Sequence, residues 1–207
     1  CPAALFLASS GVGSITLVDH DTVDLTNLQR QIGHTTSRVG APKVESLAAA
    51  LHALNPEVQV RGLQHKADES LLAAEVPRAT VVLDCSDNYR TRHAINAACM
   101  RHRIPLVAAA VIRFDGQLSV FDPRQPHSPC YACLFPPEDQ FEEVQCSTMG
   151  VFAPLVGVMG SLQATEALKL ISGAGTPLTG QLLMLDGRTM EWSRMRTHRS
   201  TDCKICG

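Results

Sequence analysis

Hydrophobic positions in the first half of the chain alternate between strand-like and helix-like spacing. Short apolar or alternating stretches predict strands at 15–18, 58–63, 80–84 and 106–111. The segments between them predict helices at 2–10, 43–54, 68–74 and 88–103. Strands that alternate with helices indicate an α/β fold with a mainly parallel sheet flanked by helices.

The pattern changes in the second half. Residues 114–121 predict strands around an Asp115–Gly116 turn, and residues 182–185 and 191–195 predict an antiparallel pair. The proline-rich stretch 123–143 predicts a loop. Residues 153–171 predict one long helix, whose small and apolar side chains suit close packing in the core or at a dimer interface. We therefore expect an antiparallel C-terminal extension.

The order of the first elements is unusual. The helix at 2–10, closed by Gly11-Val12-Gly13, precedes the first strand. A doubly wound nucleotide-binding fold instead begins with a strand and a glycine-rich loop that leads into its first helix. We expect residues 1–207 to form a single domain that is N-terminally truncated and lacks its first strand and glycine-rich loop.

Composition limits the class of protein. The 207 residues are 45% hydrophobic, with 18 Lys+Arg against 20 Asp+Glu and a net charge of −2. This balance gives no electrostatic footprint for nucleic acid or a membrane surface. No apolar run approaches the roughly 18–20 residues that span a bilayer, and no basic region precedes the first apolar stretch as in a signal peptide. We expect a cytoplasmic protein.

Four of the eight cysteines form two Cys-x-x-Cys pairs, Cys130/Cys133 and Cys203/Cys206. This spacing matches the knuckles of a tetrahedral zinc site, and sulfur is a soft ligand that zinc prefers. Four protein ligands leave no open position for catalysis, so the zinc would be structural. A disulfide or a redox pair is the alternative. A zinc ion here would join the crossover loop at 122–149 to the tail at 197–207.

Polar residues gather after the first predicted strand. Asp19 ends that strand, where an acid in an open α/β sheet commonly holds a ribose. The next segment carries Asn27, Arg30 and Lys43 with few apolar anchors, an order that suits a nucleotide triphosphate. The alternative is an ordinary strand-end acid followed by a solvated loop.

Two further residues are candidates for chemistry. Asp87 follows the strand at 80–84 and could hold Mg²⁺ that bridges phosphates, or could only cap the helix that begins at residue 88. Cys146 precedes the long helix and lies outside both knuckles. A thiol near a helix N-terminus is a candidate nucleophile, although an isolated cysteine is more often inert.

Together these motifs closely resemble the MoeB/ThiF family of ubiquitin-activating-enzyme-like adenylyltransferases. The resemblance covers essentially the whole chain and rests on six stretches: 17–31, Gly40-x-Pro-Lys43, Asp84-x-x-Asp87-Asn88, Cys130-x-x-Cys133, 150–157 and Cys203-x-x-Cys206. It implies a Rossmann-like domain that uses ATP to adenylate the C-terminal glycine of a small ubiquitin-like sulfur carrier ending in Gly-Gly. The carrier would serve molybdenum cofactor or thiamine biosynthesis, and the enzyme would be a homodimer.

The resemblance also implies roles for single residues. Asp19 matches the ribose-binding acid, Asn27, Arg30 and Lys43 match the triphosphate-binding set, and Asp87 matches the magnesium-binding acid. The knuckle cysteines match the zinc ligands. Cys146 matches a crossover cysteine that forms a sulfur-linked intermediate in some members. Because the family's glycine-rich loop is missing, we expect the 207-residue chain to bind ATP poorly.

Two other functions remain open from the sequence. One is a non-catalytic scaffold or inactive partner subunit that docks a ubiquitin-like protein. The other is a nicotinamide-dependent oxidoreductase, which the sheet and Asp19 permit but which the Arg/Lys-bearing loop and the zinc knuckles disfavour.

Overall fold

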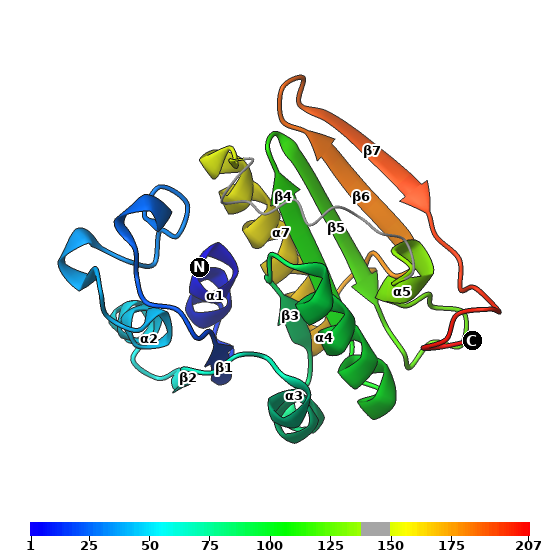
Figure 1. Ribbon diagram of the computed structural model, residues 1–207, viewed down its shortest axis with the longest axis horizontal. Helices are drawn as coiled ribbons and strands as arrows, with labels where there is room; N and C mark the ends of the chain where they lie inside the picture. The colour runs from blue at the N-terminus through cyan, green and yellow to red at the C-terminus, as the bar shows by residue number, and fades with distance from the viewer. Residues whose placement is uncertain (138–149) are drawn as a thin grey trace.

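The computed structural model describes residues 1–137 and 150–207, in which the strands form two sheets (Figure 1). In the smaller sheet, β1 (Ser14–Val18) pairs in parallel with β2 (Gln59–Leu63). The larger sheet has the order β3-β4-β5-β6-β7. Its strands are β3 (Val82–Asp84), β4 (Leu106–Ile112), β5 (Asp115–Phe121), β6 (Gln181–Asp186) and β7 (Glu191–Arg196).

Strand direction changes at β4. β3 and β4 are parallel, whereas β4, β5, β6 and β7 pair in antiparallel succession. The parallel pairs β1–β2 and β3–β4 are each connected through a helix, and the antiparallel pairs β4–β5 and β6–β7 are hairpins. β5 reaches its antiparallel neighbour β6 only through the long connection 122–180. This arrangement confirms the predicted α/β fold with an antiparallel C-terminal extension.

Helices cover both faces of the five-stranded sheet (Figure 1). The long helix α7 (Ala153–Ser172) lies on one face, and α4 (Tyr89–His102) and the single turn α5 (Tyr131–Leu134) lie on the other. α1 (Pro2–Ser9) stands between the two sheets and packs against both α7 and α2 (Lys43–Leu54). Shorter elements complete the described chain: α3 (Glu69–Glu75), η1 (Leu25–Asn27), η2 (Thr36–Arg38) and η3 (Val76–Arg78).

Two hydrophobic clusters hold these layers together. The larger lies under α7 and includes Val107, Leu118 and Met159, which are at most 1% exposed. The smaller lies under α4 and α5, where Phe121 and Tyr131 pack with their ring centroids 6.0 Å apart. The five-stranded sheet is thus buried on both faces near β3 and β4, and this fixes the carboxyl ends of those strands.

The Asp115–Gly116 turn predicted from the sequence is wrong. Both residues lie inside β5, and the chain reverses just before them, where Arg113 has a positive φ of 52°. Gly116 serves packing instead, because a Cβ there would lie 2.8 Å from Sδ of Met159 on α7. An Asp-Gly pair favours a tight turn, but the close approach of a helix also requires a glycine.

Gly11 and Gly160 have the roles that the sequence predicted for them. Gly11 has a φ of 84°, and Val12 N–H donates to the Leu7 carbonyl at 3.1 Å, so Gly11 ends α1 as expected. On α7, a Cβ at Gly160 would lie 2.9 Å from Cβ of Pro2. The small residues of α7 therefore let α1 pack closely within the core.

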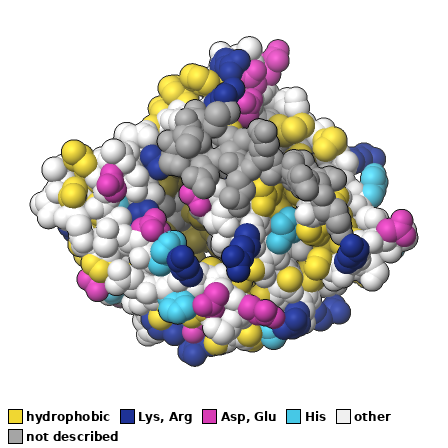
Figure 2. Space-filling view, viewed as in Figure 1, with side chains coloured by type: hydrophobic (Ala, Val, Ile, Leu, Met, Phe, Trp, Pro, Cys, Tyr) yellow, Lys and Arg dark blue, Asp and Glu magenta, His cyan; other side chains and the backbone are white. Residues whose placement is uncertain are grey.

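The surface gives no single-sign region on the face viewed in Figure 2, where acidic, basic and histidine side chains are interspersed. None of the helices within the described ranges has the length and apolar content to cross a membrane.

Candidate nucleotide and metal sites

Asp19 and Lys43 lie together at the carboxyl end of β1. The Asp19 Oδ1 atom accepts a hydrogen bond from the Asp21 backbone N–H at 2.9 Å. The Asp21 carboxylate in turn accepts from Lys43 Nζ at 2.8 Å, and this bond lowers the pKa of Asp21. The Lys43 side chain is only 10% exposed, so its charge is fixed at the N-terminus of α2.

Asn27 ends η1, and Arg30 lies in the turn that follows it. Asp24 caps this turn by accepting from Thr26 N–H at 2.7 Å. The Asn27 amide donates to Thr26 Oγ1, and the Arg30 guanidinium lies 3.5 Å from the Thr26 carbonyl oxygen. Within the described ranges, neither side chain forms a hydrogen bond or ion pair with Asp19, Lys43 or Asp87. The structure thus places Asn27 and Arg30 close to each other. Within the described residues, only the backbone connects them to Asp19, Lys43 and Asp87.

Asp87 lies on a turn at the carboxyl end of β3. Asp84 Oδ1 accepts from the backbone N–H and the hydroxyl of Ser86, at 2.9 and 2.7 Å. Arg92 Nη2 donates to the Ser86 carbonyl at 3.0 Å. The helix cap of α4 is Asn88, whose side chain accepts from Thr91 N–H at 2.8 Å. The alternative in which Asp87 is the cap is therefore wrong, and the exposed Asp87 carboxylate is available for a cation.

The groups that hold this turn are buried and charged. Asp84 is 2% exposed, and burial raises its pKa. Burial alone would lower the pKa of Arg92, but the neighbouring Tyr131 and Asp84 raise it, so the guanidinium stays charged. Asp84 is part of the sequence motif Asp84-x-x-Asp87-Asn88, but neither Asp84 nor Arg92 was predicted to have a role. Their buried, polar environment depends on contacts between distant segments.

The ends of β1 and β3 meet at the N-terminus of α1. Cys1 is the N-cap of α1, and its backbone nitrogen lies near enough to Cys85, Asp19 and Lys43 to interact with all three electrostatically. Because groups from both strand ends act on one nitrogen, Asp19 and Lys43 lie on the same side of the molecule as the Cys85–Asn88 turn. Two carboxyl ends of parallel strands that flank a helix N-terminus are typical of nucleotide sites in α/β proteins.

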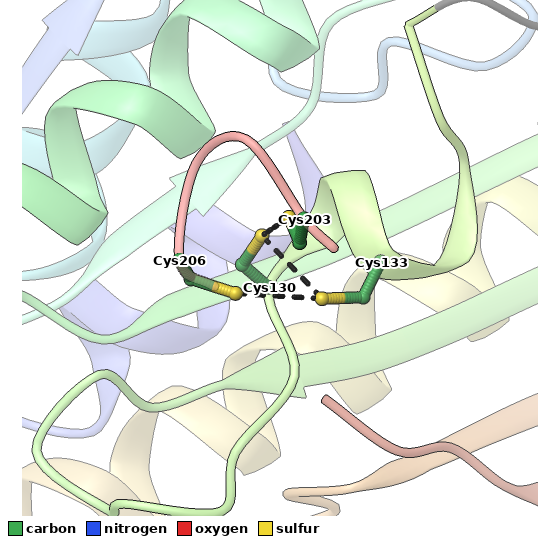
Figure 3. Close-up of side chains that lie close together, drawn as sticks. All are labelled: Cys130, Cys133, Cys203 and Cys206. Carbon is green, nitrogen blue, oxygen red and sulfur yellow. Dashed lines mark hydrogen bonds between the residues drawn. The ribbon is translucent and has the colours of Figure 1, made fainter. Parts of the chain in front are cut away.

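The four knuckle cysteines converge at the C-terminal tail (Figure 3). The sulfur of Cys130 lies 3.9 Å from that of Cys133 and 3.6 Å from that of Cys203, and the sulfur of Cys133 lies 3.4 Å from that of Cys206. A tetrahedral zinc ion with sulfur ligands at 2.3 Å separates those ligands by about 3.8 Å. The cluster therefore has the composition and spacing of a Cys₄ zinc site.

The surroundings of the cluster act differently on its thiols, because burial raises the pKa of Cys130 to about 11 and also raises that of Cys206. Although burial opposes ionisation of Cys203, the backbone N–H groups of Ile205 and Cys206 lower its pKa to about 7. The Ser200 backbone N–H donates to the Cys133 sulfur. The expectation that the first knuckle lies wholly in loop is wrong, because Cys130 precedes the helical turn α5. A single turn is favoured here because it brings two cysteines three residues apart onto one side.

Two residues complete the comparison with the sequence. Cys146 lies outside the described residues, so its role stays a prediction. Gln163 was not singled out, although the structure places it 2% exposed on α7 beside the Asp87 turn. The sequence signal that could have identified Gln163 is its polar side chain on the otherwise apolar stripe of α7, between Met159 and Ala167.

These features define an α/β protein of the Rossmann type that carries a Cys₄ cluster at its tail. Residues 1–205 match the ThiF family, and the chain belongs to that family.

Two curated relatives from Escherichia coli K12 match the whole chain. The chain is 44% identical to a molybdopterin-synthase adenylyltransferase over 209 residues, which span 82% of that protein. It is 46% identical to a sulfur carrier protein ThiS adenylyltransferase over 206 residues, which span 81% of that protein.

A solved structure shares the fold. E. coli MccB, crystallised with ATP, superposes with a TM-score of 0.85 at 24% identity. The match covers 99% of this chain and 62% of the MccB chain, so the chain spans about three fifths of that protein. At this identity the likeness shows the fold alone.

Proposed function

We propose that this protein uses ATP to adenylate the C-terminal glycine of a small ubiquitin-like sulfur carrier. The observation that supports the proposal is the grouping of Asp19 and Lys43 with Cys85, the first residue of the turn that carries Asp87, around the N-terminus of α1. A decayed, non-catalytic scaffold would have no need of this set of acid and base side chains. Relatives named for both molybdopterin synthase and ThiS match at nearly equal identity, so either carrier type fits the chain.

The reaction needs alignment and charge more than proton transfer. A terminal carboxylate is already ionised near pH 7, so it can attack the α-phosphorus of ATP without a general base. One oxygen–phosphorus bond forms to give the acyl adenylate, and the bond to the bridging oxygen breaks to release pyrophosphate. Repulsion between the carboxylate and the phosphates opposes this step, and positioned cations reduce it.

The proposed roles follow from side-chain chemistry. Asp19 accepts from the ribose hydroxyls, while Asn27 and Arg30 bind the phosphate oxygens. Arg30 offers a planar, bidentate donor set, and Lys43 offers a point charge. Asp87 would hold Mg²⁺, which when bound neutralises phosphate charge. In the nucleotide-bound protein, phosphate competes with Asp21 for the Lys43 ammonium.

The cysteine cluster has a separate, structural role in this proposal. Zn²⁺ held by Cys130, Cys133, Cys203 and Cys206 joins the crossover loop to the C-terminal tail. Four protein ligands leave no open position, so the ion supplies stability and not catalysis.

A pyrophosphate-exchange assay tests the function. The full-length protein is incubated with ATP, labelled pyrophosphate and a carrier that ends in Gly-Gly, either MoaD-type or ThiS-type. We expect carrier-dependent exchange, and the carrier with the higher kcat/KM identifies the pathway. A scaffold would bind the carrier without exchange, and an oxidoreductase would bind a nicotinamide cofactor instead. Either of these results overturns the proposal.

We also propose that a further strand and a glycine-rich loop upstream of Cys1 complete the site. Among the described strands, β1 pairs only with β2, and β3 pairs only with β4, so each leaves one edge open beside α1. A parallel strand between them would join the two sheets. Calorimetric titration with ATP tests this: the 207-residue chain should bind far more weakly than the full-length protein, and equal affinities would refute it.

Finally, we propose a homodimer. The exposed hydrophobic side chains outside the two cores, such as Phe6, Ile32 and Leu25, offer apolar area for a second subunit. Light scattering should give twice the monomer mass, and a monomer at micromolar concentration would contradict this.

A further inference from the structure

Gln163 uses its buried amide group to connect three segments. It lies on the sheet-facing side of α7 and is 2% exposed. Its Nε2 atom donates to the Asp84 carbonyl at 2.8 Å and to the Val107 carbonyl at 2.9 Å. Its Oε1 atom accepts from the Cys85 thiol at 3.3 Å. Both amide hydrogens and one of the two oxygen lone pairs are therefore in use.

These three bonds meet where the chain leaves β3. Asp84 is the last residue of β3, and Cys85 begins the turn that leads to Asp87. Val107 belongs to β4 and pairs with Leu83. Gln163 thus ties α7 to the last residue of β3, to the second residue of β4 and to the first residue of the turn.

The other side of the same turn is held by different groups. Ser86 is bonded to Asp84 and Arg92, and Asn88 caps α4. Asp87 itself is exposed, and the Asn88 amide approaches its carboxylate at 3.5 Å. The place of the Asp87 carboxylate is therefore set by the backbone of residues 84–88. Gln163 is the side chain on α7 that fixes where this backbone begins.

We propose that Gln163 is a positioning residue for Asp87, and this rests on the proposed role of Asp87 in binding the magnesium–nucleotide complex. Loss of its amide would leave two buried carbonyl oxygens and a thiol without their partner, and the turn would shift to satisfy them. A carboxylate displaced by a fraction of an ångström binds a small octahedral cation poorly, because magnesium demands near-ideal ligand geometry.

The test replaces Gln163 with methionine, which has similar length and volume but no amide. In the full-length protein, exchange is measured as magnesium is titrated at fixed ATP and carrier. We expect Gln163→Met to raise the magnesium concentration for half-maximal exchange by about tenfold, a size typical of a misplaced binding group. Zinc content and the affinity for the carrier should stay unchanged.

Glu166→Gln is the matched control on the same helix. Glu166 is 4% exposed, accepts from Leu178 N–H at 2.8 Å and pairs with Lys169, all away from the Asp87 turn. It should lower thermal stability by as much as Gln163→Met while leaving the magnesium dependence within about twofold. An equal magnesium dependence in the two variants overturns the inference, because a general loss of packing would then suffice.

Two further variants keep the outcome clear. If Gln163→Met fails to fold, Gln163→Asn, shorter by one methylene, should raise the magnesium requirement in the same direction, and a wild-type requirement overturns the inference. Asp87→Ala should abolish exchange. Normal exchange in Asp87→Ala refutes the proposed role of Asp87, whereas lost exchange with a normal Gln163→Met refutes only the inference.

Discussion

The two strand ends that form the proposed nucleotide site are built in different ways. At the end of β1, Asp19 and Lys43 are linked through Asp21, a side chain that is 52% exposed. At the end of β3, the Asp87 turn rests on Asp84, Arg92 and Gln163, which are each at most 8% exposed. The first end is held by an ion pair between a buried ammonium and an exposed carboxylate and by a polar loop, and the second end is held by a buried polar network.

This difference predicts how substitutions act at each end. A pair whose carboxylate faces water is partly screened and contributes little to stability, so substitution of Asp21 should change stability only slightly. A buried network carries a large penalty when one partner is lost, so residues near β3 affect both stability and the position of Asp87. The following experiments test the comparison, from the largest expected effect to the smallest.

Loss of a charge that contacts nucleotide should have the largest effect at both ends. Lys43→Ala and Asp87→Ala are each expected to reduce pyrophosphate exchange by about 10²–10³-fold, as removal of a transition-state charge partner does in other enzymes. Arg30→Ala should be similar. Zinc content and the far-ultraviolet spectrum serve as controls and should match the wild type. Near-normal exchange in these variants would contradict the assigned roles.

Removal of one zinc ligand should cause the next largest effect, on stability. Freshly purified protein is expected to carry one zinc per chain, and Cys133→Ser to carry none, measured by atomic emission. Because metal binding adds to folding free energy, the variant should melt about 10 °C lower. Cys99→Ser, at a buried cysteine outside the cluster, is the control and should retain zinc. Protein without zinc that melts normally would refute the structural role.

Packing between β5 and α7 should tolerate no added volume. Gly116→Ala places a Cβ 2.8 Å from Met159 Sδ and is expected to lower the unfolding free energy by about 1–3 kcal/mol. Gly157→Ala, on the same helix as Met159 but with no atom within 4 Å, should instead stabilise by about 0.5–1 kcal/mol. Equal changes in the unfolding free energy of the two variants, measured by urea denaturation, would show that β5 and α7 are not tightly packed at Gly116.

Exposed and buried carboxylates should also differ in their response to acid, and Asp122, which follows β5, is the buried example. Burial alone would raise the pKa of Asp122, but its bidentate bonds to Arg124 lower it below 3.8. The hydrogen bond from Lys43 likewise lowers the pKa of Asp21. A lowered folded pKa means that stabilisation is present above about pH 4 and is lost as the pH falls through the folded value.

Neutral variants measure these contributions. Because the Asp122 side chain is 3% exposed, Asp122→Asn should cost about 1–3 kcal/mol at pH 7, and this difference should shrink toward pH 3. Asp21→Asn, at an exposed pair, should cost less than about 1 kcal/mol at either pH. A larger loss of stability in Asp21→Asn than in Asp122→Asn, measured by thermal melting, would contradict the expected difference between exposed and buried carboxylates.

The smallest effect is expected at Cys146. Adenylation needs no thiol, because the carboxylate is itself the nucleophile, so Cys146→Ala should leave pyrophosphate exchange within about twofold of wild type. A loss of exchange would mean that the thiol acts before or during adenylation.

Local sequence patterns predicted most of the elements and both halves of the cysteine cluster. Alternating and apolar stretches predicted the positions of the strands. The spacing of Cys130, Cys133, Cys203 and Cys206 was enough to predict that the four cysteines share one site. The motif residues Asp19 and Asp87 follow strand ends, and parallel strands present those ends on the same edge of a sheet.

The remaining features depend on contacts between distant segments. Gly116 lies in a strand because Met159 packs against it, although Asp115–Gly116 has the local signature of a turn. Asn88, not Asp87, caps α4, a choice between two good capping residues that local sequence leaves open. Gln163 acquires its importance only from its bonds to residues about 80 and 56 positions away.

The central claim is that the ends of β1 and β3 share one nucleotide, and hydrogen exchange tests it most directly. Amide exchange is followed by mass spectrometry in the full-length protein, with and without magnesium–ATP. We predict slower exchange in residues 19–43 and 84–92 together, and loss of protection in both segments when either Lys43→Ala or Asp87→Ala is introduced. Protection of one segment alone, or protection of the second that survives loss of the charge on the first, would contradict a shared site.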